Sequence, residues 1–419
     1  MNLARSLAWY TATAVINSAV PFMLLPVLTH YLTLSDYGLL SAIIAYVTVL
    51  SPVIILGMPT LFSTDWHRLE RSELRRKSVV WLGLPLAVGV SLIVASWVLN
   101  DLLAVPLAVP AAWVPVIPLL GLLGLIPQWA GVMFQMADRP RHFAAYQGAQ
   151  ALLLLGTTIT FVVLMDMHWE GRLWSMLVCG VLATIVGLLF LRPYLSITTP
   201  KQDDVREAVK FGAGLLPHSV FSQLVRQSDR LFILHFIGAA AAGEYAVGWQ
   251  VASIMLVLLS TFNQAWTPYL FQSLAQADEQ RKLALVKLSY WIALGFVVLF
   301  LVINLASPLI FSKLISAKYH DAQRFIPFIT LGYLFMGFYL LVTDYIFYTK
   351  KTYLFSILTT SNGVINIALN YFCIHRFGAI GVTYAFAASS AIMMVAAWFL
   401  AHKVYPMPWM GDLTRCRRT

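Results

Sequence analysis

The sequence predicts an all-α membrane protein with twelve transmembrane helices, arranged as two six-helix halves related by a parallel pseudo-two-fold repeat. Three observations predict this fold class: the composition, the spacing of apolar windows, and a repeat at half the chain length. Of 419 residues, 60% are hydrophobic and 11% are charged, with a mean hydropathy of +0.77. A soluble domain carries roughly 25% charged residues. The composition therefore excludes a soluble protein.

Apolar windows of about 20 residues, enough to cross a hydrocarbon core of roughly 30 Å, recur along the chain. The first window is too long and too polar for a cleavable signal, so we expect it to be the first transmembrane helix. The predicted spans are 7–31, 38–62, 78–99, 112–135, 143–165, 172–191, 208–237, 242–271, 285–306, 325–348, 353–375 and 379–402.

The distribution of basic residues predicts that both termini are cytoplasmic. With that orientation, 21 of the 28 Lys and Arg residues face the cytoplasm, as the positive-inside rule requires. The formal charge of +10 follows from the same bias and gives no support to a nucleic-acid partner. The opposite side holds Arg172, Lys313, Lys318, Arg324 and Arg376.

An internal repeat predicts the two halves. The segment from Asp36 to Phe62 aligns with that from Glu244 to Phe271, each opening on an acid-Tyr pair and closing on Pro-x-Leu-Phe. Two such halves are expected to enclose a central cleft that opens alternately to each side. The predicted boundaries are an N-terminal half at 1–192, a crossover linker at 193–207, a C-terminal half at 208–403 and a basic tail at 404–419.

The seventh predicted span carries an unusual polar stripe. Gln223, Arg226, Gln227 and Arg230 recur at steps of three or four residues, so they share one helix face. Asp229 lies close enough in sequence to neutralise one of these arginines. Two interpretations stay open: an Arg-Asp pair that fixes helix packing, or a surplus positive charge that holds an anionic substrate, for which phosphate is suited to guanidinium.

Amide side chains form further stripes. In a bilayer they serve either as interhelical glue or as the lining of a wet cavity that binds sugar hydroxyls. The candidates are Asn362, Asn366 and Asn370 on the eleventh span, Gln150 on the fifth and Gln264 on the eighth.

Asp344 is a lone acid in the tenth span. It either couples transport to a proton gradient, or neutralises an arginine, or lies among headgroups near Lys350 and Lys351. Pro21, Pro26 and Pro217 predict bends that are either hinges or tolerated kinks.

The sequence contains no motif for a bound metal, a cofactor or a nucleotide. His30, His218 and His235 are isolated without metal-ligand spacing, and the three cysteines are scattered, so we expect no metal and no cofactor. No phosphate-binding Walker loop is present, which excludes ATP-driven transport by this chain.

Three segments resemble a known family: Val20 to Ser41, Gln227 to Gly248, and Ser307 to Pro327. They are similar to the polysaccharide, or O-antigen, flippases (Wzx-like) of the multidrug/oligosaccharidyl-lipid/polysaccharide exporter superfamily. The resemblance implies a bacterial inner-membrane protein, not an enzyme, that flips an undecaprenyl-diphosphate-linked oligosaccharide between leaflets by alternating access during O-antigen or lipopolysaccharide biosynthesis. The implied partners are that substrate, membrane lipids, a coupling proton or sodium ion, a glycan polymerase and a chain-length regulator.

The resemblance also assigns site residues. Cationic cavity residues of the family map onto Arg226 and Arg230, and the pair Asp229-Arg230 matches the seventh-span motif. Because the first half has no Lys or Arg deep within a predicted span, we expect an anion site that leans toward the second half. The alternatives are a multidrug or small-solute exporter, which would favour a cleft acid, and a glycan polymerase, which would need a large catalytic outer loop.

Overall fold

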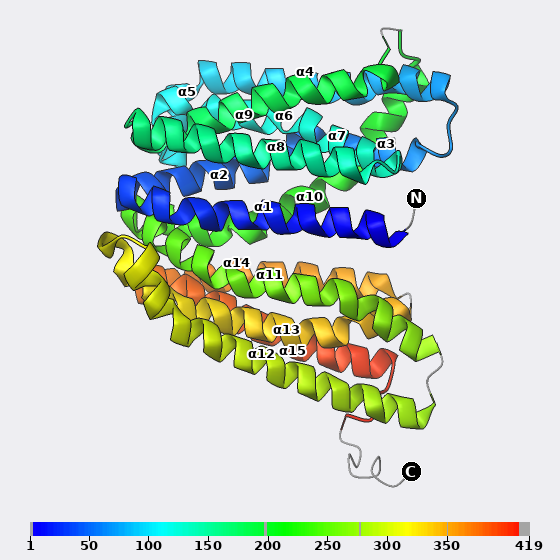
Figure 1. The fold of residues 1–419 in the computed structure, drawn as a ribbon, viewed down its shortest axis with the longest axis vertical. Helices are drawn as coiled ribbons and strands as arrows, with labels where there is room; N and C mark the ends of the chain where they lie inside the picture. Colours follow the sequence, from blue (N-terminus) through cyan, green and yellow to red (C-terminus); the bar gives the residue numbers. More distant parts are fainter. Residues whose placement is uncertain (1–2, 197–198, 276–277, 350, 410–419) are drawn as a thin grey trace. The chain divides into compact units, whose positions relative to one another are not determined.

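The computed structural model describes residues 3–196, 199–275, 278–349 and 351–409, and for residues 3–8, 11 and 352 it describes only the backbone. All regular secondary structure in these ranges is helical (Figure 1). The chain forms two compact units, Met1–Gly243 and Glu244–Thr419. The expected tail continues into residues 410–419, which lie outside the described ranges.

Unit 1 is built around two apolar clusters. Leu24, Leu32 and Ile43 belong to the first, and Phe62 and Trp129 to the second. Its elements are α1 (Leu3–Tyr31), α2 (Leu34–Ile55), α3 (Met58–Asp65), α4 (Arg71–Val98), α5 (Asn100–Leu107), η1 (Ala111–Trp113), α6 (Val116–Leu123), α7 (Leu125–Met136), α8 (Pro140–Thr158), the π-helix η2 (Ile159–Leu164), α9 (His168–Leu191), η3 (Arg192–Tyr194) and α10 (Gln202–Phe236).

Unit 2 begins within α11 (Ala239–Ala275). Helix α13 packs against α12 and α15, and α15 packs against α14. Buried Phe325, Ile329 and Ile346 lie in this packing. The remaining elements are α12 (Glu279–Leu314), η4 (Ala317–Phe325), α13 (Ile326–Tyr348), α14 (Thr352–Phe377), η5 (Gly378–Ile380) and α15 (Gly381–Val404).

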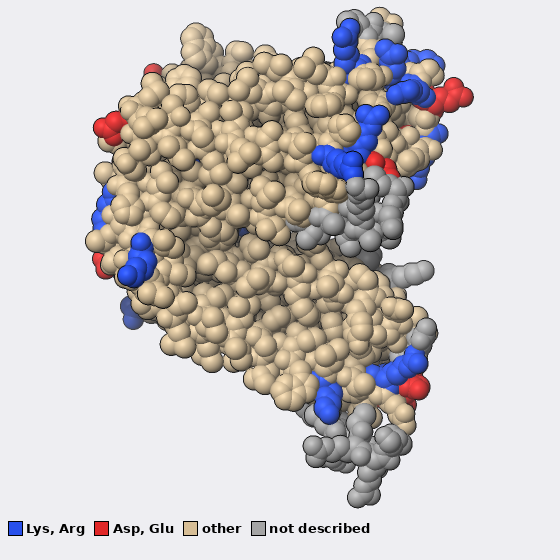
Figure 2. All heavy atoms as spheres, viewed as in Figure 1, with Lys and Arg blue, Asp and Glu red and all other residues tan. Residues whose placement is uncertain are grey.

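Within the described residues, ten helical segments are long and apolar enough to cross a membrane. One of them, Tyr353–Val404, includes both α14 and α15, and α10 is not among the ten. The prediction of an all-helical multi-pass membrane protein is confirmed, whereas the count of twelve spans stays a prediction. In Figure 2 the visible charged side chains of each unit gather near helix ends, as expected when apolar helix faces meet lipid.

Several predicted spans are interrupted. The span predicted at 38–62 ends at Ile55, because Leu56 and Gly57 take left-handed conformations with φ of 53° and 67° before α3 begins. The span predicted at 112–135 divides at Gly124, and that at 143–165 closes in the π-helix η2. The predicted linker 193–207 is partly helical, since α10 already starts at Gln202.

Ion pairs fix the first turns of α10 to α4 and α3. Asp204 accepts hydrogen bonds from Arg76 Nε at 3.0 Å and Nη2 at 3.2 Å. Lys77 Nζ lies 2.7 Å from Glu207 and 3.5 Å from Asp65. This network ties the polar start of α10 to the body of unit 1.

The first turns of α2 and α11 cross in very close contact. A β-carbon added at Gly38 would collide with the carbonyl oxygen of Ala239, and one at Gly243 would collide with that of Leu34. Only glycine permits this approach of the two backbones.

Candidate functional site

The polar stripe of α10 forms as predicted on one helix face. The Arg226 guanidinium is exposed, and it donates from Nε to Gln223 Oε1 at 3.2 Å and from Nη2 to Ser222 Oγ at 3.5 Å. Gln227 and Arg230 are half-buried. Arg226 is therefore held by neutral neighbours one turn earlier on its own helix.

Arg230 interacts with a half-buried tyrosine of another helix. Helix α10 packs against α2 in unit 1, and Arg230 is within electrostatic range of Tyr37 on α2. Both Arg230 and its neighbour Asp229 make interactions within the structure. Tyr37 is near the start of α2, so Arg230 sits toward that end of the unit.

A further arginine approaches Tyr37 from α9. Arg172 is also within electrostatic range of Tyr37, and α9 contacts α2. Arg172 Nη1 donates to Thr158 Oγ1 at 2.6 Å. In unit 1, Arg172 from α9 and Arg230 from α10 thus both act on one tyrosine of α2.

The Arg172 contact rests on a buried hydroxyl cluster. Ser175 Oγ is 2.9 Å from Thr158 Oγ1 and 2.7 Å from Thr157 Oγ1, and both Thr158 and Ser175 are completely buried. The cluster joins the end of α8, just before η2, to the second turn of α9. It positions Thr158 to accept from the arginine.

The sequence placed Arg172 at the outer edge of the sixth predicted span, and the expectation that the first half has no cation deep within a span stays a prediction. Helix α9 begins at His168, so Arg172 lies a full turn inside the helix rather than in the preceding loop. Sequence reasoning placed it outside because it stands at the edge of the apolar window. The available signal was the hydroxyl pair Thr157-Thr158 facing Ser175 across a short connection.

Charge compensation around Arg172 is incomplete. Within the described ranges its recorded hydrogen bond goes to a neutral hydroxyl, and it takes part in no ion pair. A guanidinium offers five N–H donors. A poorly hydrated cation without an anionic partner costs free energy, which an incoming anion would offset.

The α8 amide is placed beside α9. Cys179 Sγ contacts the backbone carbonyl of Gln150 at 3.6 Å, while the Gln150 side-chain Nε2 is buried and has no hydrogen-bond partner in the described part of the chain. Gln150 thus retains a donor that a bound hydroxyl group could satisfy.

The asparagine ladder lies between two helices of unit 2. Asn366 Nδ2 donates to Ser389 Oγ on α15 at 2.9 Å, and Asn370 Nδ2 donates to Asn366 Oδ1 at 3.1 Å. Asn366 is 6% exposed and Asn370 is fully buried. These two amides join α14 to α15, which supports the packing interpretation, and Asn362 continues the ladder one turn earlier.

Asp344 is a buried carboxylate with a neutral partner. Thr267 Oγ1, on α11, donates to Asp344 Oδ2 at 2.7 Å, and Asp344 is 5% exposed. Asp344 enters no ion pair among the described residues, although Lys350 is outside them. Gln264 is exposed one turn before Thr267 on α11.

The three prolines lie within continuous helices. Pro21 and Pro26 are inside α1, and Pro217 is inside α10. The carbonyl of Pro26 accepts from Thr29 Oγ1 at 3.1 Å, and His30 Nδ1 lies 2.7 Å from it. Their hinge role stays a prediction. The described residues hold no group of three or more potential metal ligands.

The comparisons with known proteins place this arrangement in a family. Residues 3–274 match the family model described as polysaccharide biosynthesis protein, which covers more than half of the chain. The chain belongs to the polysaccharide biosynthesis protein family. Residues 215–372 also match the MatE model. The family assignment confirms a transporter or flippase of the polysaccharide-synthesis type, not an enzyme.

Two curated relatives come from Haemophilus influenzae. "Lsg locus putative protein 1" is 22% identical over 384 residues, covering 88% of this chain and 90% of the relative. An "Uncharacterized membrane protein" is 22% identical over 369 residues, covering 84% and 85% respectively.

Solved structures share the fold. One is the inward-facing conformation of a multidrug resistance MATE family transporter of the MOP superfamily, with TM-score 0.67, 14% identity, and 97% and 99% of the two chains covered. Another is a MOP superfamily transporter from Pyrococcus furiosus, whose description notes a reversed polarity of its binding pocket. It has TM-score 0.62 and 13% identity, with 99% and 96% covered. At these identities the likeness concerns the fold.

Proposed function

We propose that this family member flips an undecaprenyl-diphosphate-linked oligosaccharide across the bacterial inner membrane by alternating access, with both termini in the cytoplasm. The observation that carries the proposal is the pair Arg172 and Arg230 around Tyr37 in unit 1. Membership of a polysaccharide biosynthesis family supports a glycan-bearing substrate. O-antigen or another surface polysaccharide is the proposed cargo.

The chemistry of the two arginines suits a diphosphate. Guanidinium stays charged at any depth and donates two parallel hydrogen bonds to phosphate oxygens. Arg172 acts on Tyr37 from α9 and Arg230 from α10, so we assign the phosphoryl groups of the diphosphate to arginines on two different helices. Arg226, exposed one turn earlier on α10, extends the positive charge along the stripe.

The remaining polar groups divide by their surroundings. Gln223, Gln227, Gln150 and Gln264 are accessible or carry an unused donor, and we assign them to glycan hydroxyls. Asn366 and Asn370 are occupied between α14 and α15, so we assign them to packing. The glycan contacts therefore come from glutamines rather than from the asparagine ladder.

Asp344 is the proposed coupling group. Its partner in the described chain is the neutral hydroxyl of Thr267 on α11, and an intramembrane carboxyl group of this kind can take up and release a proton. Release of that proton requires water or a cation to reach the site, which a change of conformation can provide. Asp344→Asn should keep the protein folded and remove the dependence of transport on the proton gradient.

The test follows the leaflet in which lipid-linked oligosaccharide accumulates in cells that lack the protein. Wild type and Arg376→Ala, an exposed arginine at the end of α14, should clear the cytoplasmic pool. Arg172→Ala and Arg230→Ala should leave it in place while remaining abundant in the membrane. If deletion of the protein leaves that pool unchanged, the proposed function is wrong.

Export of multidrug or small solutes is the second candidate. Buried Asp344, which has no cation beside it in the described chain, is the acid that a cationic drug would seek, and residues 215–372 match the MatE model. Drug resistance that depends on Asp344 and not on Arg172 would favour this candidate over the flippase.

A further inference from the structure

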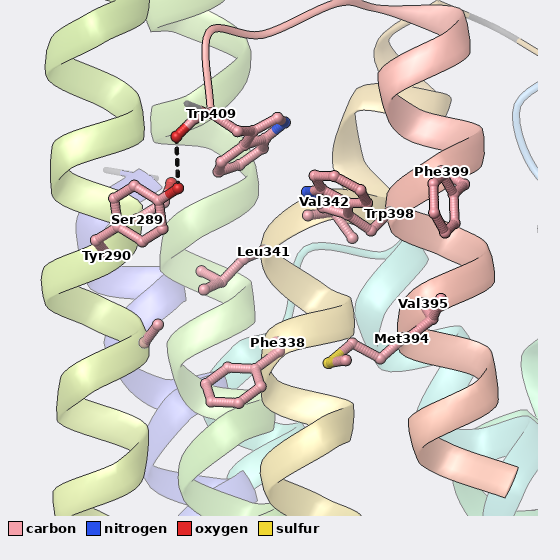
Figure 3. Close-up of a pocket in the computed structure, with 11 residues that line it drawn as sticks. Ser289, Tyr290, Phe338, Leu341, Val342, Met394, Val395, Trp398, Phe399 and Trp409 are labelled. Atoms are coloured by element: carbon pink, nitrogen blue, oxygen red, sulfur yellow. Dashed lines mark hydrogen bonds between the residues drawn. The ribbon is translucent and has the colours of Figure 1, made fainter. Parts of the chain in front are cut away.

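Unit 2 contains an apolar groove that the polar site does not use. It lies where α13 is flanked by α12 and α15, and has a volume of about 470 Å³ (Figure 3). Helix α13 supplies the base, and the other two helices supply the walls. The lining residues are Ser289, Tyr290, Ala293, Phe338, Leu341, Val342, Met394, Val395, Trp398, Phe399 and Trp409.

The groove is open to the surface and offers almost no polar atoms. Phe399 is 62% exposed, and Tyr290 and Val395 are each 45% exposed. The Ser289 hydroxyl donates within its own helix to Leu285 O at 2.9 Å. The Tyr290 hydroxyl donates to Trp409 O at 2.6 Å. A ligand therefore meets hydrocarbon and aromatic surface.

The segment that follows α15 closes one end of the groove. Trp409 packs edge-on against Tyr290 and Tyr345, with ring centroids 6.3 Å and 6.1 Å apart. Tyr405 stacks on Tyr345 at 5.9 Å, and Met407 is buried. We call residues 405–409 the C-terminal strap. It fixes Trp409 across the groove, as Figure 3 shows at its upper end.

The strapped end carries the features of a membrane interface. Tyr290, Trp398 and Trp409 gather there, and Trp and Tyr are enriched at headgroup level. Lys287 is exposed one turn before Tyr290, and Lys403 is exposed shortly after Trp398. Neither lysine takes part in an ion pair among the described residues. An anionic head beside these lysines would place its chain along the groove.

We infer that this groove binds the polyprenyl chain of a phosphate-bearing lipid, with the phosphate near Lys287 and Lys403 and the chain directed toward Phe338. The inference rests on the proposed function, because the substrate's chain must stay in lipid while its polar part crosses. The methyl-branched chain makes dispersion contacts with the Phe, Trp and Met side chains of the lining. Holding the chain keeps the substrate at the protein during the crossing.

The experiment uses the full chain in nanodiscs of phosphatidylethanolamine and phosphatidylglycerol, with undecaprenyl phosphate that carries a photoreactive group in its chain. We expect crosslinks in α12, α13 and α15 that excess undecaprenyl phosphate removes and excess phosphatidylglycerol does not. Equal removal by both lipids would make the groove an ordinary annular-lipid site and overturn the inference.

Groove-filling variants give the second arm. Ala293→Phe and Val395→Trp occupy the space from opposite walls, and should lower crosslinking roughly tenfold because at least two methylene groups lose their contacts. Ala368→Phe adds the same bulk at an exposed position of α14 and should change nothing. Full crosslinking in both filled variants, with unchanged elution from size exclusion, would contradict the inference.

Crosslinking and flipping are measured separately, so the two proposals can fail separately. Arg172→Ala should lose flipping and keep crosslinking. If wild-type protein crosslinks to the chain and flips no substrate, the proposed function is wrong and the inference about the groove still holds. If the protein flips the substrate but no crosslink forms in α12, α13 or α15, the inference about the groove is wrong and the proposed function still holds.

Discussion

The helix pairs α8–α9 in unit 1 and α14–α15 in unit 2 occupy corresponding positions in the two sequence halves, yet different chemistry joins them. In unit 1 the contact uses hydroxyls: Thr157, Thr158 and Ser175. In unit 2 it uses amides and one hydroxyl: Asn366, Asn370 and Ser389. Both contacts are buried and both satisfy polar groups across a helix interface.

The difference is the arginine. Hydroxyls can donate to one another and still accept a hydrogen bond from Arg172, so the unit 1 cluster holds a cation at its edge. In unit 2 the Asn370 amide donates to Asn366, which donates to Ser389, and no cation takes part in these contacts in the described structure. Under the proposed function, equivalent helix pairs serve binding in one half and packing in the other.

The largest expected effect separates these two roles. Arg172→Ala should reduce flipping by about 100-fold, because a charge-assisted contact to phosphate is worth up to about 3 kcal/mol. Leaflet-resolved quantification of lipid-linked oligosaccharide measures this effect, with Arg376→Ala as the arginine control. Wild-type flipping by Arg172→Ala would assign the hydroxyl cluster to packing alone.

Asn366→Leu tests the packing role in unit 2. The substitution removes the bond to Ser389 and leaves Asn370 with an altered partner, so we expect a loss of about 1–2 kcal/mol of stability. Thermal unfolding in detergent measures the loss. Transport of long and short glycans should fall equally, whereas a selective loss for long glycans would return this amide to the binding site.

Smaller effects are expected from the two serines. Ser389→Ala should cost about 0.6 kcal/mol, the average for an interhelical hydrogen bond in a bilayer. Ser175→Ala should cost about 1 kcal/mol, since Ser175 contacts both threonines. Unfolding of the two variants beside wild type measures the difference. Equal costs would remove the contrast between the clusters.

The smallest effect concerns pH and the ion pairs at the start of α10. Burial acts to raise the pKa of Asp204, but hydrogen bonds from Arg76 and from the backbone of Lys201, with the charges of Arg76 and Lys77, hold this pKa below its ordinary value. Because the folded pKa is the lower one, the stabilisation is present above the unfolded pKa near 4 and disappears as pH falls through the folded value.

Thermal midpoints recorded from pH 7 down to pH 3 test this expectation. Wild type should lose a few degrees on the acid side, and Asp204→Asn should start lower and change less. The neutral contact of Asn366 with Ser389 should show no such dependence. Parallel acid curves for wild type and Asp204→Asn would contradict it.

The apolar windows predicted most helices because lipid-facing and buried helix faces are both apolar. The same argument could not find the interruption at Leu56 and Gly57, where a left-handed pair divides one apolar run into α2 and α3. Nor could it find the π-helix η2, since Ile159–Leu164 is as apolar as the α-helix before it. The pattern of apolar residues shows which segments are apolar, but it does not show where the backbone hydrogen bonds of a helix change or stop.

The stripes were predicted at the level of a helix face. The i, i+4 spacing of Asn366 and Asn370 correctly implies neighbouring side chains, which share a hydrogen bond. Which helix packs against that face depends on the tertiary structure. The choice between interhelical packing and the lining of a cavity therefore required knowing that α15 lies against it. The contact between Arg172 and Thr158 could not be predicted for a related reason: Thr158 lies on another helix, and a single window contains no information about it.

The C-terminal strap has a practical consequence for handling the protein. A purification tag fused after Thr419 follows the strap in sequence and leaves the ring contacts of Tyr405 and Trp409 in place. A truncation after Val404 removes Tyr405 and Trp409, and with them the aromatic contacts to Tyr345 and Tyr290. The truncated protein would have an apolar groove that is open at this end, and detergent could enter it readily. Truncated and tagged versions would then differ in bound detergent even where their yields agree.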